Sequence, residues 1–341
     1  MRPERDTIIQ FTHRPSAHCE NGVTSNLLNF YLIDLSEPLV FGIGSGIFFS
    51  YMPFIKLNYL PVISFRPLPG WIFKRVNNRL GMKIKRKKFA SPKKAMDALD
   101  ANLERGIPTG CLVGVYHLTY FPRSYRFHFN AHNIIVFGRE NDKYLVSDPV
   151  MEKPERLSYE DLKRVRYAKG TYPPIGRMYW VESKPEHFDL KKAIVKGIRK
   201  TSQDMLHIPV PLFGIKGIRY LSRRMRKWPH KFGPEKASLY LGQAIRMLEE
   251  IGTGGAGFRF IYAAFLQEAA GILEMDWLNE LSDEMTAAGD RWRQFAIMAG
   301  RIFKNRANNE ETYETAANIL MDIAEREERI FRRLKKISLS E

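Results

Sequence analysis

The stretch that decides the fold is residues 12–31, which read THRPSAHCENGVTSNLLNFY. Apolar residues recur at helical spacing from Val23 and Leu27 onward, which predicts a buried helix that begins near Cys19, with Ser16 as its N-cap. A thiol in the first turn of a helix feels the positive end of the helix dipole, which favours the thiolate. Cys19 is therefore a candidate nucleophile. Free cysteines are also commonly buried without any chemical role, so a base and an orienting group are needed beside it.

Length and composition indicate a two-domain intracellular protein. The chain has 341 residues and only two cysteines, Cys19 and Cys111, which give no disulfide framework and favour a reducing compartment. Residues 1–6 are charged and lack an apolar core, so we expect no signal peptide. The apolar stretch 39–55 is interrupted by glycines and a proline and is too short to span a bilayer. We therefore expect a cytoplasmic protein.

The order of predicted elements divides the chain into an α+β part and a helical part. Residues 1–186 are expected to form an α+β domain and residues 187–341 an all-helical domain. In the first part the Gly-spaced segment 39–51 predicts tight turns and close backbone packing. The other predicted elements of that part are helices 18–33, 71–80, 92–104 and 158–166, strands 62–66, 109–116, 129–138, 143–147 and 176–182, and a basic strand or loop 83–88. Predicted helices of the second part are 189–204, 214–227, 234–251, 256–274, 276–304 and 309–337.

A base and its orienting group are predicted in the hairpin formed by strands 129–138 and 143–147. His132 opens the first strand, and Asp148 follows the second one in an Asp-Pro step. If Phe137 pairs with Lys143, counting outward places His132 opposite Asp148, at a Cβ separation of about 5 Å. Asp148 is then expected to accept the proton of His132 Nδ1 and to leave Nε2 facing Cys19. A half-buried histidine and a simple Asp-Pro turn are the alternative interpretation.

The order Cys, His, Asp resembles the layout of papain-like cysteine enzymes, and the segment around His132 and Asp148 also resembles the bacteriocin-processing peptidases. A closer resemblance is to the BtrH family, named for an acyltransferase of butirosin biosynthesis. Its N-terminal motif is similar to His18-Cys19-Glu20, Asn26-Leu27-Leu28, Leu35-Ser36-Glu37 and Phe41-Gly42-Ile43-Gly44. Its helical companion domain is similar to the stretch Gly252–Leu266. The resemblance implies that residues 1–186 are a papain-like catalytic domain and that residues 187–341 are a helical domain that binds substrate or partner.

This resemblance implies acyl transfer from an acyl carrier protein thioester to a small amine through an acyl-Cys19 intermediate, with His132 and Asp148. The donor arm is phosphopantetheine, and no bound cofactor is implied. Papain-like enzymes usually place a glutamine in the oxyanion hole, and the corresponding offset here holds His13. We expect His13 or His18 to act as an auxiliary or oxyanion-hole residue. The residues expected to contact substrate are Glu20, Arg259 and Tyr262; a packing role is the alternative for Arg259 and Tyr262.

The formal charge of +17 predicts an anionic partner. An acidic acyl carrier protein fits this charge, and the basic tract 216–231 can alternatively lie on an anionic membrane surface or be a solvated face. We expect no nucleic acid, because no binding motif accompanies the charge. No Cys/His cluster has metal-ligand spacing. Two other functions stay open: a cysteine peptidase or amidase with the same residues, and a non-catalytic module that binds a carrier or membrane through its basic face.

Overall fold

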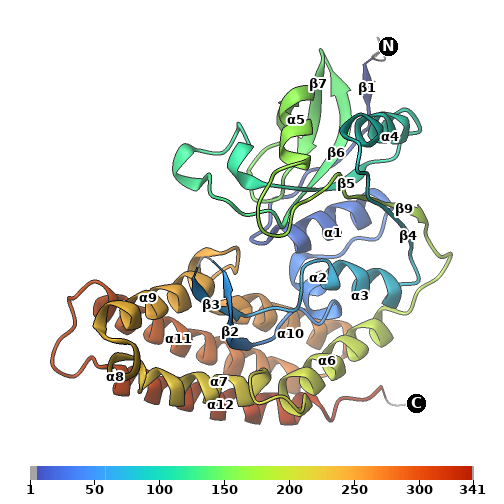
Figure 1. The fold of residues 1–341 in the computed structure, drawn as a ribbon. Helices are drawn as coiled ribbons and strands as arrows, with labels where there is room; N and C mark the ends of the chain where they lie inside the picture. The colour runs from blue at the N-terminus through green and yellow to red at the C-terminus, as the bar shows by residue number, and fades with distance from the viewer. Residues whose placement is uncertain (1–5, 58, 340–341) are drawn as a thin grey trace. The chain divides into compact units, whose positions relative to one another are not determined.

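The computed structural model describes residues 6–57 and 59–339 and divides into two compact units (Figure 1). Unit 1 comprises the chain up to Glu37 together with Asn77–Phe188, and unit 2 comprises Pro38–Val76 together with the chain from Asp189. The expected first domain of 1–186 is therefore interrupted, because residues 38–76 pack with the C-terminal helices. The charged residues 1–5, from which we expected no signal peptide, lie outside the described part.

Unit 1 is an α+β structure built on an antiparallel sheet with the strand order β4-β9-β5-β6-β7-β8, and β1 pairs with β6. Its strands are β1 (Thr7–Ile8), β4 (Lys83–Lys87), β5 (Thr109–Val113), β6 (His132–Glu140), β7 (Lys143–Ser147), β8 (Glu155–Ser158) and β9 (Met178–Ser183). Its helices are α1 (Cys19–Phe30), α4 (Pro92–Glu104) and α5 (Tyr159–Arg166), with the 3-10 turns η1 (Val115–His117) and η2 (Arg123–Tyr125). This agrees with the predicted fold class.

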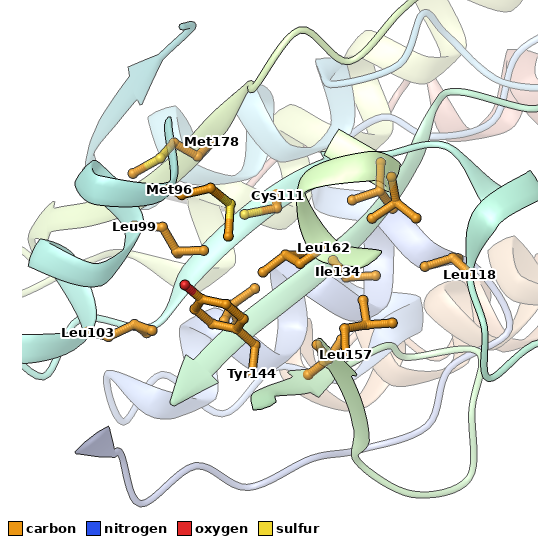
Figure 2. Close-up of a cluster of buried hydrophobic side chains, with 14 of the residues drawn as sticks. Met96, Leu99, Leu103, Cys111, Leu118, Ile134, Tyr144, Leu157, Leu162 and Met178 are labelled. Carbon is orange, nitrogen blue, oxygen red and sulfur yellow. The ribbon is translucent and has the colours of Figure 1, made fainter. Parts of the chain in front are cut away.

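Local capping explains two of these helices. The side chain of Ser91 accepts a hydrogen bond from the backbone N–H of Lys94, and Pro92 occupies the first position of α4. Ser158 caps α5 in the same way through the N–H of Asp161. One face of each helix is then buried against the sheet. Figure 2 shows this core, in which side chains from both helices meet apolar residues of β5, β6, β7 and β8.

Unit 2 is largely helical. It contains α2 (Glu37–Ile43, whose first residue belongs to unit 1), α6 (Leu190–His207), α7 (Gly214–Met225), α8 (Trp228–Phe232), α9 (Pro234–Ile245), α10 (Arg259–Leu273), α11 (Trp277–Phe303) and α12 (Tyr313–Leu334). It also holds the short turns η3 (Arg246–Glu250) and η4 (Ala256–Phe258) and a two-stranded sheet of β2 (Ser50–Leu57) and β3 (Leu60–Ser64). Helix α3 (Trp71–Arg79) leads back to unit 1.

Glycine packing explains why residues 38–76 join the helices. The first part of the segment predicted to form tight turns is the end of α2, and a tight turn at residues 44–45 follows it. A Cβ at Gly42 of α2 would lie 2.1 Å from the ring of Phe265 on α10. Gly197 on α6 approaches the backbone of Gly42 as closely, since a Cβ there would lie 2.5 Å from the Gly42 carbonyl oxygen. Only glycine permits these approaches, so the expected close backbone packing is present, but it joins α2 to α6 and α10.

Candidate active site

The N-terminus of α1 holds Cys19 at the first helical position. The N-cap is His18 and not the predicted Ser16, because the His18 side chain accepts from the N–H of Asn21 and the Ser16 N–H donates to the carbonyl of Pro149. The Glu37 carboxylate accepts the N–H groups of residues 17 and 18, each at 2.8 Å. These bonds satisfy donors at the helix entrance and fix the direction in which the thiol is presented.

His132 and Asp148 meet through a strand register that differs from the predicted one. The hairpin turn is two residues long, with Glu140 opposite Lys143 and positive φ at both turn residues. A bulge at Phe137 then shifts the register, and Ile135 lies opposite Ser147. His132 and Asp148 are therefore diagonal neighbours, a separation that long side chains bridge. His132 Nε2 lies 2.7 Å from Asp148 Oδ2.

The ring of His132 joins the carboxylate of Asp148 to the thiol of Cys19. It shares a side-chain hydrogen bond with Cys19, and because Nε2 faces Asp148, Nδ1 is the nitrogen left for the sulfur. This orientation is the reverse of the expected one. Burial lowers the pKa of His132, but the charges and hydrogen bonds of Asp148 and Cys19 outweigh it and raise that pKa to about 10. The imidazolium form is therefore favoured at neutral pH, and its charge favours a thiolate at Cys19.

Two further groups hold Asp148, and sequence reasoning did not identify either. The Tyr120 hydroxyl donates to Oδ2 at 2.8 Å, and the Val150 N–H donates to Oδ1 at 3.2 Å. Burial and the charge of Asp148 raise the pKa of Tyr120 well above its usual value, which keeps the hydroxyl protonated as a donor. The ring of Phe121 meets the ring of His132 edge to face at 5.7 Å. Tyr120 and Phe121 lie in a loop whose sequence carries no recognisable motif.

His13 and His18 have positioning roles and not the expected oxyanion-hole roles. His13 Nε2 lies 3.0 Å from the carbonyl oxygen of Met151, so Nε2 must carry the proton, and Nδ1 lies 2.8 Å from Ser147 Oγ. Both ring nitrogens of His13 therefore contact residues that flank Asp148 in the chain, Ser147 before it and Met151 after it. His18 caps α1. The backbone N–H of Cys19, at the N-terminus of the helix, is a candidate oxyanion donor.

The three expected substrate contacts differ in their surroundings. Glu20 is buried on α1 beside Tyr179, whose pKa is raised by burial and then by the Glu20 charge; its contact with substrate stays a prediction. Arg259 is fully buried in unit 2 and donates to Glu327 through Nε and Nη2 and to the Gly257 carbonyl through Nη1. Tyr262 is enclosed among the aromatic rings of its unit. The structure therefore assigns the last two a packing role, because their polar groups are engaged or enclosed.

No group of three or more His, Cys, Asp or Glu side chains within residues 6–57 and 59–339 has the arrangement of a metal site. In the same part of the chain, no helix combines the length and the apolar character that crossing a bilayer requires.

Comparison with known proteins gives two family matches. Residues 18–149 match the family described as butirosin biosynthesis protein H, N-terminal, which confirms the resemblance stated from the sequence motif. Residues 160–334, just over half of the chain, match the family described as a domain of unknown function, DUF4872. No curated protein matches the chain. Among solved structures, a protein from Bacillus anthracis described as a C39-like peptidase is similar at 11% identity and a TM-score of 0.38, over 53% of this chain and 100% of that one.

Proposed function

Since this chain belongs to the DUF4872 family and carries the N-terminal domain of the butirosin biosynthesis protein H family, we propose that it is a cysteine-dependent acyltransferase of a biosynthetic pathway. The donor is an acyl carrier protein thioester and the acceptor is a small amine. The observation that carries the proposal is the buried chain of contacts from Cys19 through His132 to Asp148. A thiolate paired with an imidazolium is the form that attacks a thioester.

In the first step the Cys19 sulfur attacks the thioester carbonyl of the donor. The carbonyl oxygen becomes an oxyanion, which the backbone N–H of Cys19 is positioned to stabilise at the end of α1. The bond between carbonyl carbon and pantetheine sulfur then breaks. The proton on His132 Nδ1 passes to the departing pantetheine sulfur, which leaves as a thiol, and acyl-Cys19 and a neutral imidazole remain.

In the second step the amine nitrogen attacks acyl-Cys19. Neutral His132 accepts one proton from the attacking nitrogen, the carbon–sulfur bond breaks, and an amide is released. Cys19 returns to the thiolate and His132 to the imidazolium, so the cycle closes without an added reductant or oxidant. Asp148 keeps its charge throughout and holds the ring while it gains and loses the proton.

Restricted access of water supports transfer over hydrolysis. Cys19 and His132 are only 7% and 5% exposed, and Asp148 is fully buried. An acyl-enzyme survives long enough to meet an amine only where water reaches it slowly. A hydrolase built on the same residues is the second candidate, and it requires ready access of water to the intermediate.

The charge of the chain supports an acidic carrier protein as donor. The net charge is +17, and β4, an edge strand of the unit 1 sheet, contributes the exposed run Lys85–Lys87. A basic surface of this kind accelerates the encounter with an acidic partner through long-range attraction. The phosphate of the phosphopantetheine arm adds a local anion to that attraction.

The test is mass spectrometry of the intact protein after incubation with a panel of acyl carrier proteins bearing different acyl groups. We expect a mass gain that is absent in Cys19→Ala, retained in Cys111→Ala and discharged as an amide when amines are added. Loss of the adduct in water alone, with release of free acid, would favour the hydrolase. No adduct with any donor, or an adduct retained in Cys19→Ala, contradicts cysteine catalysis and favours a non-catalytic carrier-binding module.

A further inference from the structure

The hairpin of β2 and β3 carries large apolar side chains that face solvent. Phe54 is 70% exposed, Ile55 is 44% exposed and Tyr59 is 92% exposed. Leu239, on α9 in the same unit, is 55% exposed. Three large apolar side chains between positions 54 and 59 form a group, and exposed apolar groups of this kind commonly mark an interaction site.

A break in the strand pairing creates this projection. Met52 pairs with Val62, and the next pair is Lys56 with Pro61. Residues 53–55 of β2 therefore lie between two consecutive partners on β3 and bulge out of the ladder. A regular strand would turn one of the neighbours Phe54 and Ile55 toward the protein, but on the bulge both face water. The local fold thus holds apolar side chains outward.

Three lysines lie on aromatic rings near the hairpin, and one of them, Lys56, is next to its turn. Lys56 Nζ donates to the Tyr240 hydroxyl at 2.8 Å and lies 4.6 Å from the centre of its ring. The ring of Tyr240 lies 5.3 Å from the ring of Phe232, over which Lys231 and Lys236 are placed. Figure 1 shows the hairpin beside α9, with α8 at the start of that helix. Cations held on aromatic rings thus adjoin the exposed apolar group.

We infer that this hairpin docks the protein on an anionic lipid surface. Exposed apolar side chains with lysines near them match the boundary between acyl chains and anionic headgroups, where aromatic and basic residues are enriched. The net charge of +17 adds long-range attraction to such a surface. The projecting side chains are few: Phe54 and Ile55 stand on the bulge and Tyr59 lies in the turn. Such a narrow projection suits shallow insertion better than the broad flat contact of a protein partner. This inference is independent of the proposed acyl transfer.

The test is flotation of the whole protein with vesicles of phosphatidylcholine alone and of phosphatidylcholine mixed with phosphatidylglycerol. We expect binding to the mixed vesicles only, weakened at least about tenfold in Phe54→Ser/Ile55→Ser, since burial of the two side chains in the bilayer is lost. Lys231→Glu/Lys236→Glu is expected to weaken it more than about tenfold, because each cation near such a surface contributes roughly fivefold. Ile297→Ser, which removes a 58% exposed side chain on α11, is the matched control and should bind normally.

A second measurement reports insertion directly. Tyr59→Cys, labelled with a polarity-sensitive dye in a Cys19→Ser background, should shift its emission to the blue on the mixed vesicles. Circular dichroism of each variant checks that it is folded. Equal vesicle binding by the hairpin variant and the wild type, or the absence of an emission shift, overturns the inference. The inference is also overturned if the protein captures a protein partner but does not float with vesicles.

Discussion

Replacing His132 with alanine tests the ion pair on which the proposed chemistry depends. The pKa of His132 is raised to about 10 by the charges and hydrogen bonds of Asp148 and Cys19, so at pH 7 the ring is predominantly imidazolium. A Cys19 thiolate beside this imidazolium is expected to react over the whole pH range in which the ion pair persists. Without the ring, Cys19 loses the cation that favours its thiolate, and a thiol with the model-peptide pKa of about 8.5 is only about 3% thiolate at pH 7.

The expected loss in reactivity at pH 7 is therefore about 30-fold in thiolate fraction. Since a thiolate of higher pKa is intrinsically more nucleophilic, the measured loss should be nearer tenfold. The assay is alkylation by iodoacetamide followed by intact mass and peptide mapping, between about pH 6 and 9. Cys111→Ser serves as the control, because Cys111 is fully buried and burial raises its pKa.

The wild type should be alkylated at a nearly constant rate over this pH range, whereas the alkylation rate of His132→Ala should rise steeply with pH. A wild-type rate that climbs like that of an ordinary thiol would refute the ion pair. An unchanged profile in His132→Ala would show that the ring does not influence the sulfur.

Three further predictions follow from the same contacts. Tyr120→Phe removes one hydrogen bond to Asp148 and should slow acyl transfer by about tenfold with little change in thermal stability, measured by adduct formation and melting; normal kinetics would exclude a positioning role. Arg259→Met leaves Glu327 buried without its cation and should lower the free energy of unfolding by about 3–5 kcal/mol, measured by urea titration. The double variant Arg259→Met/Glu327→Leu should recover part of that loss, and a larger loss in the double variant would contradict this explanation. Folding raises the pKa of His132 from 6.5 to about 10, so the stabilising effect of the protonated ring should be complete below pH 6.5 and disappear as the pH rises through about 10. The difference in unfolding free energy between the wild type and His132→Gln should therefore shrink as the pH rises over that window; a difference that grows would contradict this prediction.

Much of the fold could be predicted from local sequence signals. The caps at Ser91 and Ser158 and the helical periodicity after residue 187 depend on neighbours in the chain, and the structure contains the corresponding helices. The predicted hairpin is present as β6 and β7 for the same reason. The assignment of residues 38–76 to unit 2 was not predictable in this way, since it depends on contacts of Gly42 with α6 and α10, which lie far along the chain.

The geometry of the candidate site was only partly accessible from sequence. The register count paired His132 with Asp148 through an assumed turn. The observed turn is shorter and places Glu140 opposite Lys143, and a bulge at Phe137 then shifts the register by one residue, while the two side chains still meet. A bulge depends on packing on both faces of a strand, which a residue count does not represent. Tyr120 comes from an irregular loop, where neither periodicity nor spacing indicates the position of a hydroxyl.

The sequence by itself determined the chemical types and their order: a cysteine that starts a helix, a histidine that starts a strand and an aspartate after the next strand. Those features follow from short-range conformational preferences, which depend only on neighbouring residues in the chain. Only the tertiary structure decided that Nε2 of His132 faces Asp148, that Tyr120 holds the carboxylate and that His13 braces the turn around it. The physical reason is that ring orientation and hydrogen-bond partners depend on distances between residues 16 to 138 positions apart, which only the packed chain defines.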